Sequence, residues 1–227
     1  MKKVISYLIL ITALLLVTLV IILSTKGVKT KKFNNLISDK VSQTKNIDLK
    51  LDEIKFKIDV KELSLFLETQ NPKVTYRNVF IPVQDIKVYV DFLSLLRSNL
   101  KVEKSSVVLK ELDIEQLKKL SAVFKPSNFK SLLNNKIKKG KIISEIEIFL
   151  NDQGTLENFI AKGKVKGLKV QLFNDLNFSK VNLSFFADRN DILIKNIFGD
   201  IADIKISDGD IKLNFEKGIK LNSNFIS

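Results

Sequence analysis

The stretch VISYLILITALLLVTLVIIL, from Val4 to Leu23, decides how the rest of the chain is interpreted, because its twenty residues include no charge, no proline and no glycine. A helix of this length is about 30 Å long, which matches the hydrocarbon core of a bilayer. The stretch therefore predicts a transmembrane anchor over residues 1–25. A cleaved signal peptide is the alternative, although its apolar run would span only about 7–15 residues and no small-residue cleavage site follows Leu23.

The charges on either side of this span leave its orientation open. Lys2, Lys3 and the amino terminus precede it, and four lysines follow it at positions 26, 29, 31 and 32. The positive-inside rule, applied to this count alone, favours a cytoplasmic body. Residues 26–45 are polar and rich in lysine, and they predict a juxtamembrane stalk that leads to a folded body over residues 46–227.

The composition excludes most enzyme chemistry. The chain has no cysteine and no histidine, so it has no thiol nucleophile, no Ser-His pair and none of the usual transition-metal ligands. Its carboxylates fall mainly in turns or on polar strand positions, so a hydrolase that uses two acids is a weak hypothesis. The run Asp208-Gly209-Asp210 lacks the other ligand positions of a calcium loop. We expect a protein that is not an enzyme and that holds no metal and no cofactor.

The net charge of +13 is carried mainly by lysine. Of the 38 basic residues only Arg77, Arg97 and Arg189 are arginine, so the other 35 are lysine. Nucleic-acid binders more often use the forked guanidinium of arginine to contact phosphate and guanine. We therefore expect no nucleic-acid partner.

After residue 46 the apolar residues alternate with polar ones, as in Ile54, Phe56 and Ile58. This period of two is typical of a strand with one apolar and one solvated face. Further alternating runs follow, with turn residues between them at Asn71-Pro72, Asn151–Gly154, Asp188–Asp191 and Ser207–Asp210. The pattern predicts a mainly β fold: an elongated, curved and groove-like antiparallel sheet, preceded by one N-terminal transmembrane helix.

A short helical insertion is predicted over residues 113–140, where the alternation breaks. Asp113 and Gln116 have the spacing of a capping box, and Pro126 ends the first helix. A second helix follows and stops at Gly140.

The apolar positions of the strands form one predicted surface. Two interpretations stay open: a second layer closes this surface into an ordinary core, or the surface is an open groove that lipid acyl chains fill. Under the second interpretation the lipid-facing residues are Phe56, Ile58, Val88, Val90, Ile146, Ile148, Val181, Leu183, Phe185, Ile192, Ile194, Leu213 and Phe215.

The helical insertion is also the most basic segment, with eight lysines and no acid between Gln116 and Ser144. Lysines on a solvated helix surface are the simple interpretation. Near a membrane such a cluster can also bind anionic head groups. The candidates for that role are Lys118, Lys119, Lys136, Lys138 and Lys139.

The order of these elements resembles a known family. A single N-terminal span is followed by LFLETQNPKVTY at residues 65–76 and by IPVQDIKVYVDFLSLL at residues 81–96. These runs are similar to the start of the AsmA-like family of envelope proteins, the AsmA, YhdP and TamB group. The match covers most of residues 1–150 in order, and its motifs carry structure and no chemistry.

The resemblance implies a bacterial inner-membrane anchor at residues 4–23, a body in the periplasm, and a long β-groove that carries phospholipid toward the outer membrane. It offers no catalytic or metal-binding residues. It also implies a longer protein whose sheet continues beyond residue 227. The alternative function is a structural or assembly factor of the envelope, in which a sheet edge pairs with a partner protein by strand addition.

Overall fold

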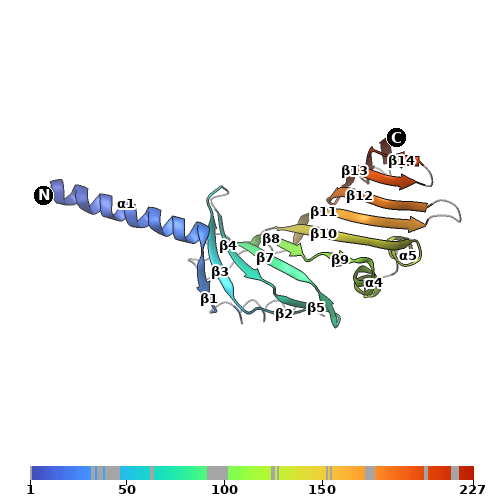
Figure 1. The fold of residues 1–227 in the computed structure, drawn as a ribbon. Helices are drawn as coiled ribbons and strands as arrows, with labels where there is room; N and C mark the ends of the chain where they lie inside the picture. Colours follow the sequence, from blue (N-terminus) through green and yellow to red (C-terminus); the bar gives the residue numbers. More distant parts are fainter. Residues whose placement is uncertain are drawn as a thin grey trace.

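The computed structural model describes residues 2–31, 34, 38, 47–61, 64–90, 102–123, 126, 128–151, 153, 155–171, 177–201, 204–215 and 220–227. The fold is mainly β, as predicted, with one long N-terminal helix, α1 (Lys2–Thr25), and two short helices, α4 (Ile114–Ala122) and α5 (Asn128–Asn135). Figure 1 shows α1 projecting from one end of the body and α5 lying at the other end.

A single large antiparallel sheet organises the body. Its strands lie side by side in the order β1 (Val28–Thr30), β3 (Ile54–Asp59), β4 (Ser64–Gln70), β7 (Val83–Val90), β8 (Val102–Leu109), β10 (Ile137–Leu150), β11 (Leu156–Gln171), β12 (Asn177–Ala187), β13 (Asp191–Ile201), β15 (Asp208–Asn214) and β16 (Lys220–Ile226). Two short strands lie off this path: β9 (Leu112–Asp113) pairs with β10, and β14 (Ile204–Ile206) pairs with β13.

A second sheet contains three strands, β2 (Ile47–Lys50), β5 (Lys73–Tyr76) and β6 (Val79–Ile81). It takes β5 and β6 from the chain between β4 and β7, and β2 from the chain before β3. The chain leaves the large sheet at the predicted Asn71-Pro72 turn, where Asn71 has a φ of 49°. It returns after Pro82, whose carbonyl accepts a hydrogen bond from the Lys110 amide.

Helix α1 joins the sheet directly. Gly27 ends the helix with a φ of 70°, and its amide donates to the Ile22 carbonyl at 2.9 Å. Strand β1 begins at Val28 and pairs opposite Phe56 of β3. A Cβ at Gly27 would lie 2.9 Å from the Phe56 carbonyl oxygen, so the turn is tightly packed. Within the predicted stalk over residues 26–45, residues 28–30 pair with the sheet edge as β1, and residues 32–33, 35–37 and 39–45 lie outside the described part.

The apolar segment of α1 is long and apolar enough to cross a membrane. It is the one such helix in the described part of the chain, and a signal sequence near an N-terminus has the same properties.

The helical insertion is shorter than predicted. The capping box is present, because the Asp113 carboxylate accepts from the Gln116 amide at 2.8 Å and the Gln116 side chain accepts from the Asp113 amide at 3.0 Å. However, α5 ends at Asn135, and Ile137 already pairs with Val170 of β11. The extension to Gly140 was wrong because β11 supplies ladder partners for this backbone.

Of the predicted turns toward the C-terminus, one is confirmed and one is wrong. The Asp188 carboxylate accepts from the amides of Asn190 and Asp191, both at 2.8 Å, and so forms the turn between β12 and β13. Asp208, in contrast, begins β15, which pairs with β13 and β16. The Asp-Gly-Asp run looked like a turn, but its three residues pair with Ile226, Phe225 and Asn224 of β16.

Irregularities in the pairing line up across neighbouring strands. The register shifts beside Gly140 in β10, near Gly167 in β11 and near Lys180 in β12. Gly167 and Lys180 have positive φ values of 58° and 53°, and Asn196 in β13 has 54°. Because bulges bend and twist the strand that holds them, this line of bulges curves the part of the sheet between β10 and β13.

Candidate functional site

The pairing register assembles one apolar row across ten strands. Residues that pair directly opposite each other share a face of the sheet. Successive pairs connect Ile54, Thr69, Ile86, Val107, Ile146, Ala161, Ala187, Ile192, Leu213 and Leu221, from β3 to β16. All but Thr69 are apolar. We call the face that carries this row the apolar face, and the other side the polar face.

Most of the thirteen predicted lipid-facing residues lie on the apolar face. The pairing places eleven of them there: Phe56, Ile58, Val88, Val90, Ile146, Ile148, Leu183, Phe185, Ile192, Ile194 and Leu213. Val181 joins them, because it lines the same pocket as Leu183. Phe215 lies just beyond β15, where its amide donates to the Asn190 carbonyl, and the register does not assign it a face.

The apolar face is closed at one end and open at the other. Ile54 and Thr69, near α1, are only 1% and 6% exposed. Ile146 and Ile192 are half-buried, and Leu221 on the edge strand β16 is 60% exposed. The row is therefore buried in β3 and β4, half-buried from β7 to β15 and exposed in β16, although Val181, Ile197 and Ile206 beyond β10 are also buried.

A pocket lies on the open part of the apolar face. Its volume is about 190 Å³, and its lining comes from β11 to β16: Leu168, Val170, Phe178, Val181, Leu183, Ile194, Ile197, Gly199, Ile201, Ile206, Ile211 and Phe225. Every described residue of this lining is apolar. The line of bulges curves the sheet around this pocket, and Gly199 allows β13 to approach β12, since a Cβ there would lie 2.8 Å from the Val181 Cα.

Two cross-strand glycine–phenylalanine pairs also shape the apolar face. Gly163 lies opposite Phe185, and Gly209 lies opposite Phe225. A Cβ at Gly163 would meet the Phe185 ring at 2.7 Å, and one at Gly209 would meet the Phe225 ring. Each ring therefore lies flat over its partner strand, in the space that a side chain would otherwise fill.

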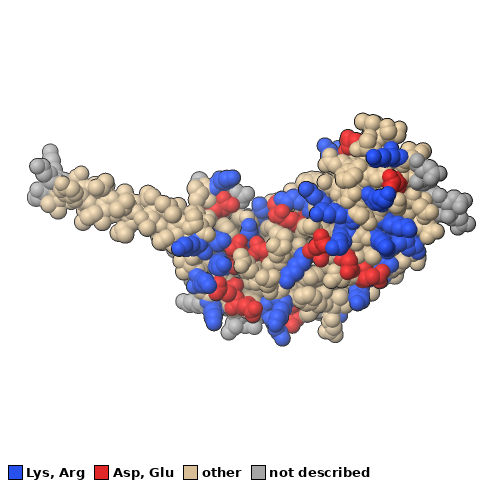
Figure 2. All heavy atoms as spheres, in the orientation of Figure 1, with Lys and Arg blue, Asp and Glu red and all other residues tan. Residues whose placement is uncertain are grey.

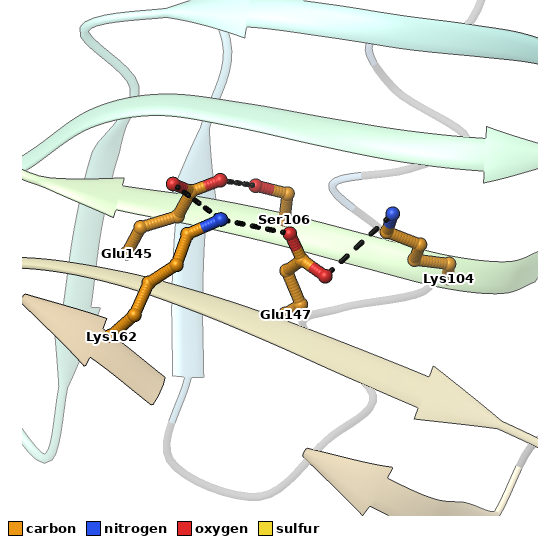
Figure 3. A network of polar contacts seen from close by, with 5 residues as sticks. All are labelled: Lys104, Ser106, Glu145, Glu147 and Lys162. Carbon is orange, nitrogen blue, oxygen red and sulfur yellow. Dashed lines mark hydrogen bonds and ion pairs between the residues drawn. The ribbon is translucent and has the colours of Figure 1, made fainter. Parts of the chain in front are cut away.

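The polar face over β8, β10 and β11 carries a network of paired charges (Figure 3). The Lys162 ammonium lies 3.2 Å from Glu145 and 3.3 Å from Glu147. Glu147 also contacts Lys104 at 3.7 Å, and Ser106 donates to Glu145 at 3.2 Å. The hydrogen bond to Glu145 is the largest cause that raises the pKa of Lys162. These side chains neutralise each other, and the arrangement requires no ligand.

A second, more buried charge cluster lies on the polar face of β3, β4 and β7. Lys57 and Glu68 form an ion pair at 2.6 Å, and both side chains are largely buried. Burial and the nearby Glu68 carboxylate raise the pKa of Asp85. Among the described residues, one buried Asp85 carboxylate oxygen has no hydrogen-bond partner. The Lys57–Glu68 ion pair connects β3 to β4 on this face.

The five lysines predicted as candidates for head-group binding lie on different elements and have different contacts. Lys118 pairs with Glu115 at 3.1 Å, and Lys138 donates to the Asn135 carbonyl at 2.9 Å. Lys119 and Lys136 are exposed, on α4 and directly after α5. Lys139 is on strand β10, opposite Lys169.

The sequence interpretation missed the lysines of β11 that lie beside this segment. Residues 158–171 contain four lysines and no acid, as residues 117–144 contain eight and no acid. Pairing of β10 with β11 brings these two acid-free segments together. The absence of acids from the second segment was the signal that would have found it.

Comparison with known proteins gives no match to any family model, any curated protein or any solved structure. Similarity to AsmA-like proteins therefore stays a prediction from the sequence. In the described part of the chain no group of three or more acidic, cysteine or histidine side chains is placed to hold a metal.

Proposed function

We propose that the chain is a membrane-anchored, non-catalytic protein of the bacterial envelope whose apolar face accepts the acyl chains of phospholipids. Its role is phospholipid transport or homeostasis between the inner and outer membranes. Helix α1 holds it in the inner membrane, and the body lies in the periplasm. The localisation rests on the resemblance to AsmA-like proteins.

One observation carries this proposal: the apolar row continues across ten strands and becomes more exposed toward β16. At about 4.8 Å per strand, nine steps cover about 43 Å, which is longer than a single acyl chain. Soluble monomers rarely leave apolar surface of this extent exposed, because each exposed Å² costs about 25 cal/mol. An acyl chain that lies along the row removes that cost.

The row also provides a physical mechanism for movement. Contacts between an acyl chain and aliphatic side chains have no preferred direction, so a bound chain can slide from one strand to the next with little change in free energy. The ion-paired network around Lys162 on the polar face stays in water meanwhile. Net transfer of lipid then follows the difference in lipid concentration between the two ends of the row, and the protein needs no energy source of its own.

Photo-crosslinking tests the proposal directly. A photoreactive amino acid is placed in the full chain in cells at Phe225, which lines the pocket, and at Ile148, which is on the apolar face further from the pocket. Asn224 is the matched control, because it is exposed on the same edge strand but pairs with Asp210, one position away from the Gly209–Phe225 pair, and so faces the opposite side. We expect phospholipid on Phe225 and Ile148 only. Equal labelling at Asn224, or no lipid at any position, contradicts the proposal.

The free edge of β16 supports a second candidate function. All seven residues of β16 are exposed, and this strand is at the end of the large sheet. Such an edge can pair with an added strand of another envelope protein. In the same experiment, protein adducts at both Phe225 and Asn224 without lipid would favour this assembly role.

A further inference from the structure

Six exposed lysines gather on the polar face at the end of the sheet near α5. We call them the lysine platform: Lys139, Lys141, Lys164, Lys166, Lys169 and Lys195. In the ladder between β10 and β11, Lys139 lies opposite Lys169 and Lys141 lies opposite Lys166. Lys164 and Lys195 both pair with Ser184 of β12, on either side of it. Figure 2 shows basic side chains over this end of β10 and β11.

Most of the positive charge of the lysine platform is not balanced by acidic side chains. Lys141 pairs with Glu111 at 2.6 Å, and Lys166 adds to the positive field that lowers the pKa of this carboxyl. Within the described part of the chain, no carboxylate lies within ion-pair distance of the other five. Like charges directly opposite each other destabilise a ladder. The neighbouring network around Lys162 balances its charges, whereas the platform gathers five lysines without a carboxylate partner in the described part of the chain, and an anionic ligand would relieve their repulsion.

The side chains around the platform favour the head-group layer of a bilayer as the anionic ligand. Two phenylalanines on the polar face are exposed beside the lysines, Phe186 at 40% and Phe198 at 49%. Lysines around exposed aromatic rings are typical of surfaces that lie in the interface of a bilayer. No arginine is among them, so the forked contacts that favour nucleic acid are missing. We infer that the lysine platform docks on a bilayer surface that carries anionic head groups.

The position of the platform indicates that this bilayer is not the one that holds α1. Helix α1 meets the sheet at β1 and β3, and β11 lies five strands beyond β3. Five strand spacings are about 24 Å, whereas the Debye length at physiological salt is about 8 Å. Figure 1 shows this end of β10 and β11 remote from α1. The docked bilayer is a second membrane, contacted in trans, and it meets the polar face and not the apolar face.

Vesicle tethering tests this inference with the full chain. The protein is inserted through α1 into nanodiscs of neutral phosphatidylcholine and mixed with vesicles that contain phosphatidylglycerol. We expect the nanodiscs to float with these vesicles, to stay apart from neutral vesicles, and to be released at ionic strength near 1 M, where the Debye length is about 3 Å. The triple variant Lys139→Gln, Lys166→Gln and Lys169→Gln is expected to bind about 100-fold more weakly.

A matched triple variant removes the same charge elsewhere: Lys50→Gln, Lys61→Gln and Lys73→Gln, all at exposed positions outside the platform. We expect it to bind like the wild type. An equal loss in both variants would show a non-specific charge effect and overturn the inference. The inference is also overturned if anionic lipid binds the platform only when it is in the nanodisc that holds α1 and not when it is in the added vesicles. Binding of DNA without binding of any vesicle would overturn it as well.

Two further readouts keep the test independent of folding and of the proposed function. Removal of the opposed lysines relieves repulsion, so the platform variant is expected to unfold at an equal or higher urea concentration than the wild type. Lipid crosslinking at Phe225 is expected to be unchanged in it, because the platform and the pocket are on opposite faces. A destabilised platform variant would contradict the repulsion on which the inference rests.

Discussion

Gly163→Ala is the substitution whose effect the structure predicts most sharply. Gly163 is in the middle of β11, and a Cβ on it would meet the backbone oxygen of Ile143 and lie 2.7 Å from the Phe185 ring. The ring can move only by leaving the strand it covers. The Ile143 carbonyl can move only if β10 shifts, and the ladder with β11 opposes that shift.

The expected loss of stability follows from two opposing effects. Inserting a methyl group into a well-packed site costs about 1–3 kcal/mol. Replacing a strand glycine by alanine regains about 0.5–1 kcal/mol, because the unfolded chain loses conformational freedom. Because the new Cβ meets backbone as well as the ring, the upper part of the resulting range applies, and we expect Gly163→Ala to lower the free energy of unfolding by about 1–2.5 kcal/mol. We also expect weaker lipid labelling at Ile148, because the displaced Phe185 ring would lie in the groove.

Urea unfolding of the full chain in detergent, followed by the circular dichroism of the sheet, measures this loss. Two other glycines are the controls. Gly167 has a φ of 58° with open space around it, so alanine there costs only backbone strain, about 1 kcal/mol. Gly209 faces Phe225 on the edge strand, whose ring can turn into solvent, so alanine there costs little. A Gly163→Ala protein as stable as the wild type would refute the packing argument.

Three further predictions concern the two faces and the insertion. Replacing Ile148 and Phe185 together by Asp is expected to abolish lipid labelling at Phe225 in a protein that still folds; retained labelling would count against an acyl-chain groove. Burial and Glu68 raise the pKa of Asp85, so protonation of this carboxyl favours the folded state, and the free energy of unfolding rises as pH falls toward the pKa of Asp85 in the unfolded chain. Asp85→Asn is expected to be more stable than the wild type at neutral pH and to lose that part of the pH dependence. Urea titrations at several pH values would show both effects. Asp113→Ala removes the cap of α4 and is expected to cost about 1 kcal/mol, measured as faster amide exchange in that helix; unchanged exchange would show that packing alone holds the helix.

Much of the candidate site could be predicted from the sequence, because a strand puts alternate side chains on opposite faces whatever it pairs with. The alternation at Ile146 and Ile148, or at Ile192 and Ile194, was enough to place them on one apolar surface. The capping box at Asp113 was equally local, since it needs only residues three positions apart. Both predictions depend on contacts within a few residues.

The errors occurred where distant segments compete for the same backbone. Ile137 fits the helical pattern of α5, but β11 pairs with it and extends β10 instead. Asp208 and Gly209 look like a turn, but both pair with β16, opposite Ile226 and Phe225. The missed lysines of β11 have the same cause, because their neighbours on β10 are about thirty residues away along the chain.

The sequence by itself determined the apolar helix, the alternation of the strands and the absence of thiol and imidazole chemistry, because each of these depends on residue type and on short spacings. Only the tertiary structure decided that the apolar row crosses ten strands and opens toward β16, that aligned bulges curve it around a pocket, and that two acid-free segments meet in the lysine platform. The physical reason is that strand order and register come from long-range pairing, which no local pattern encodes.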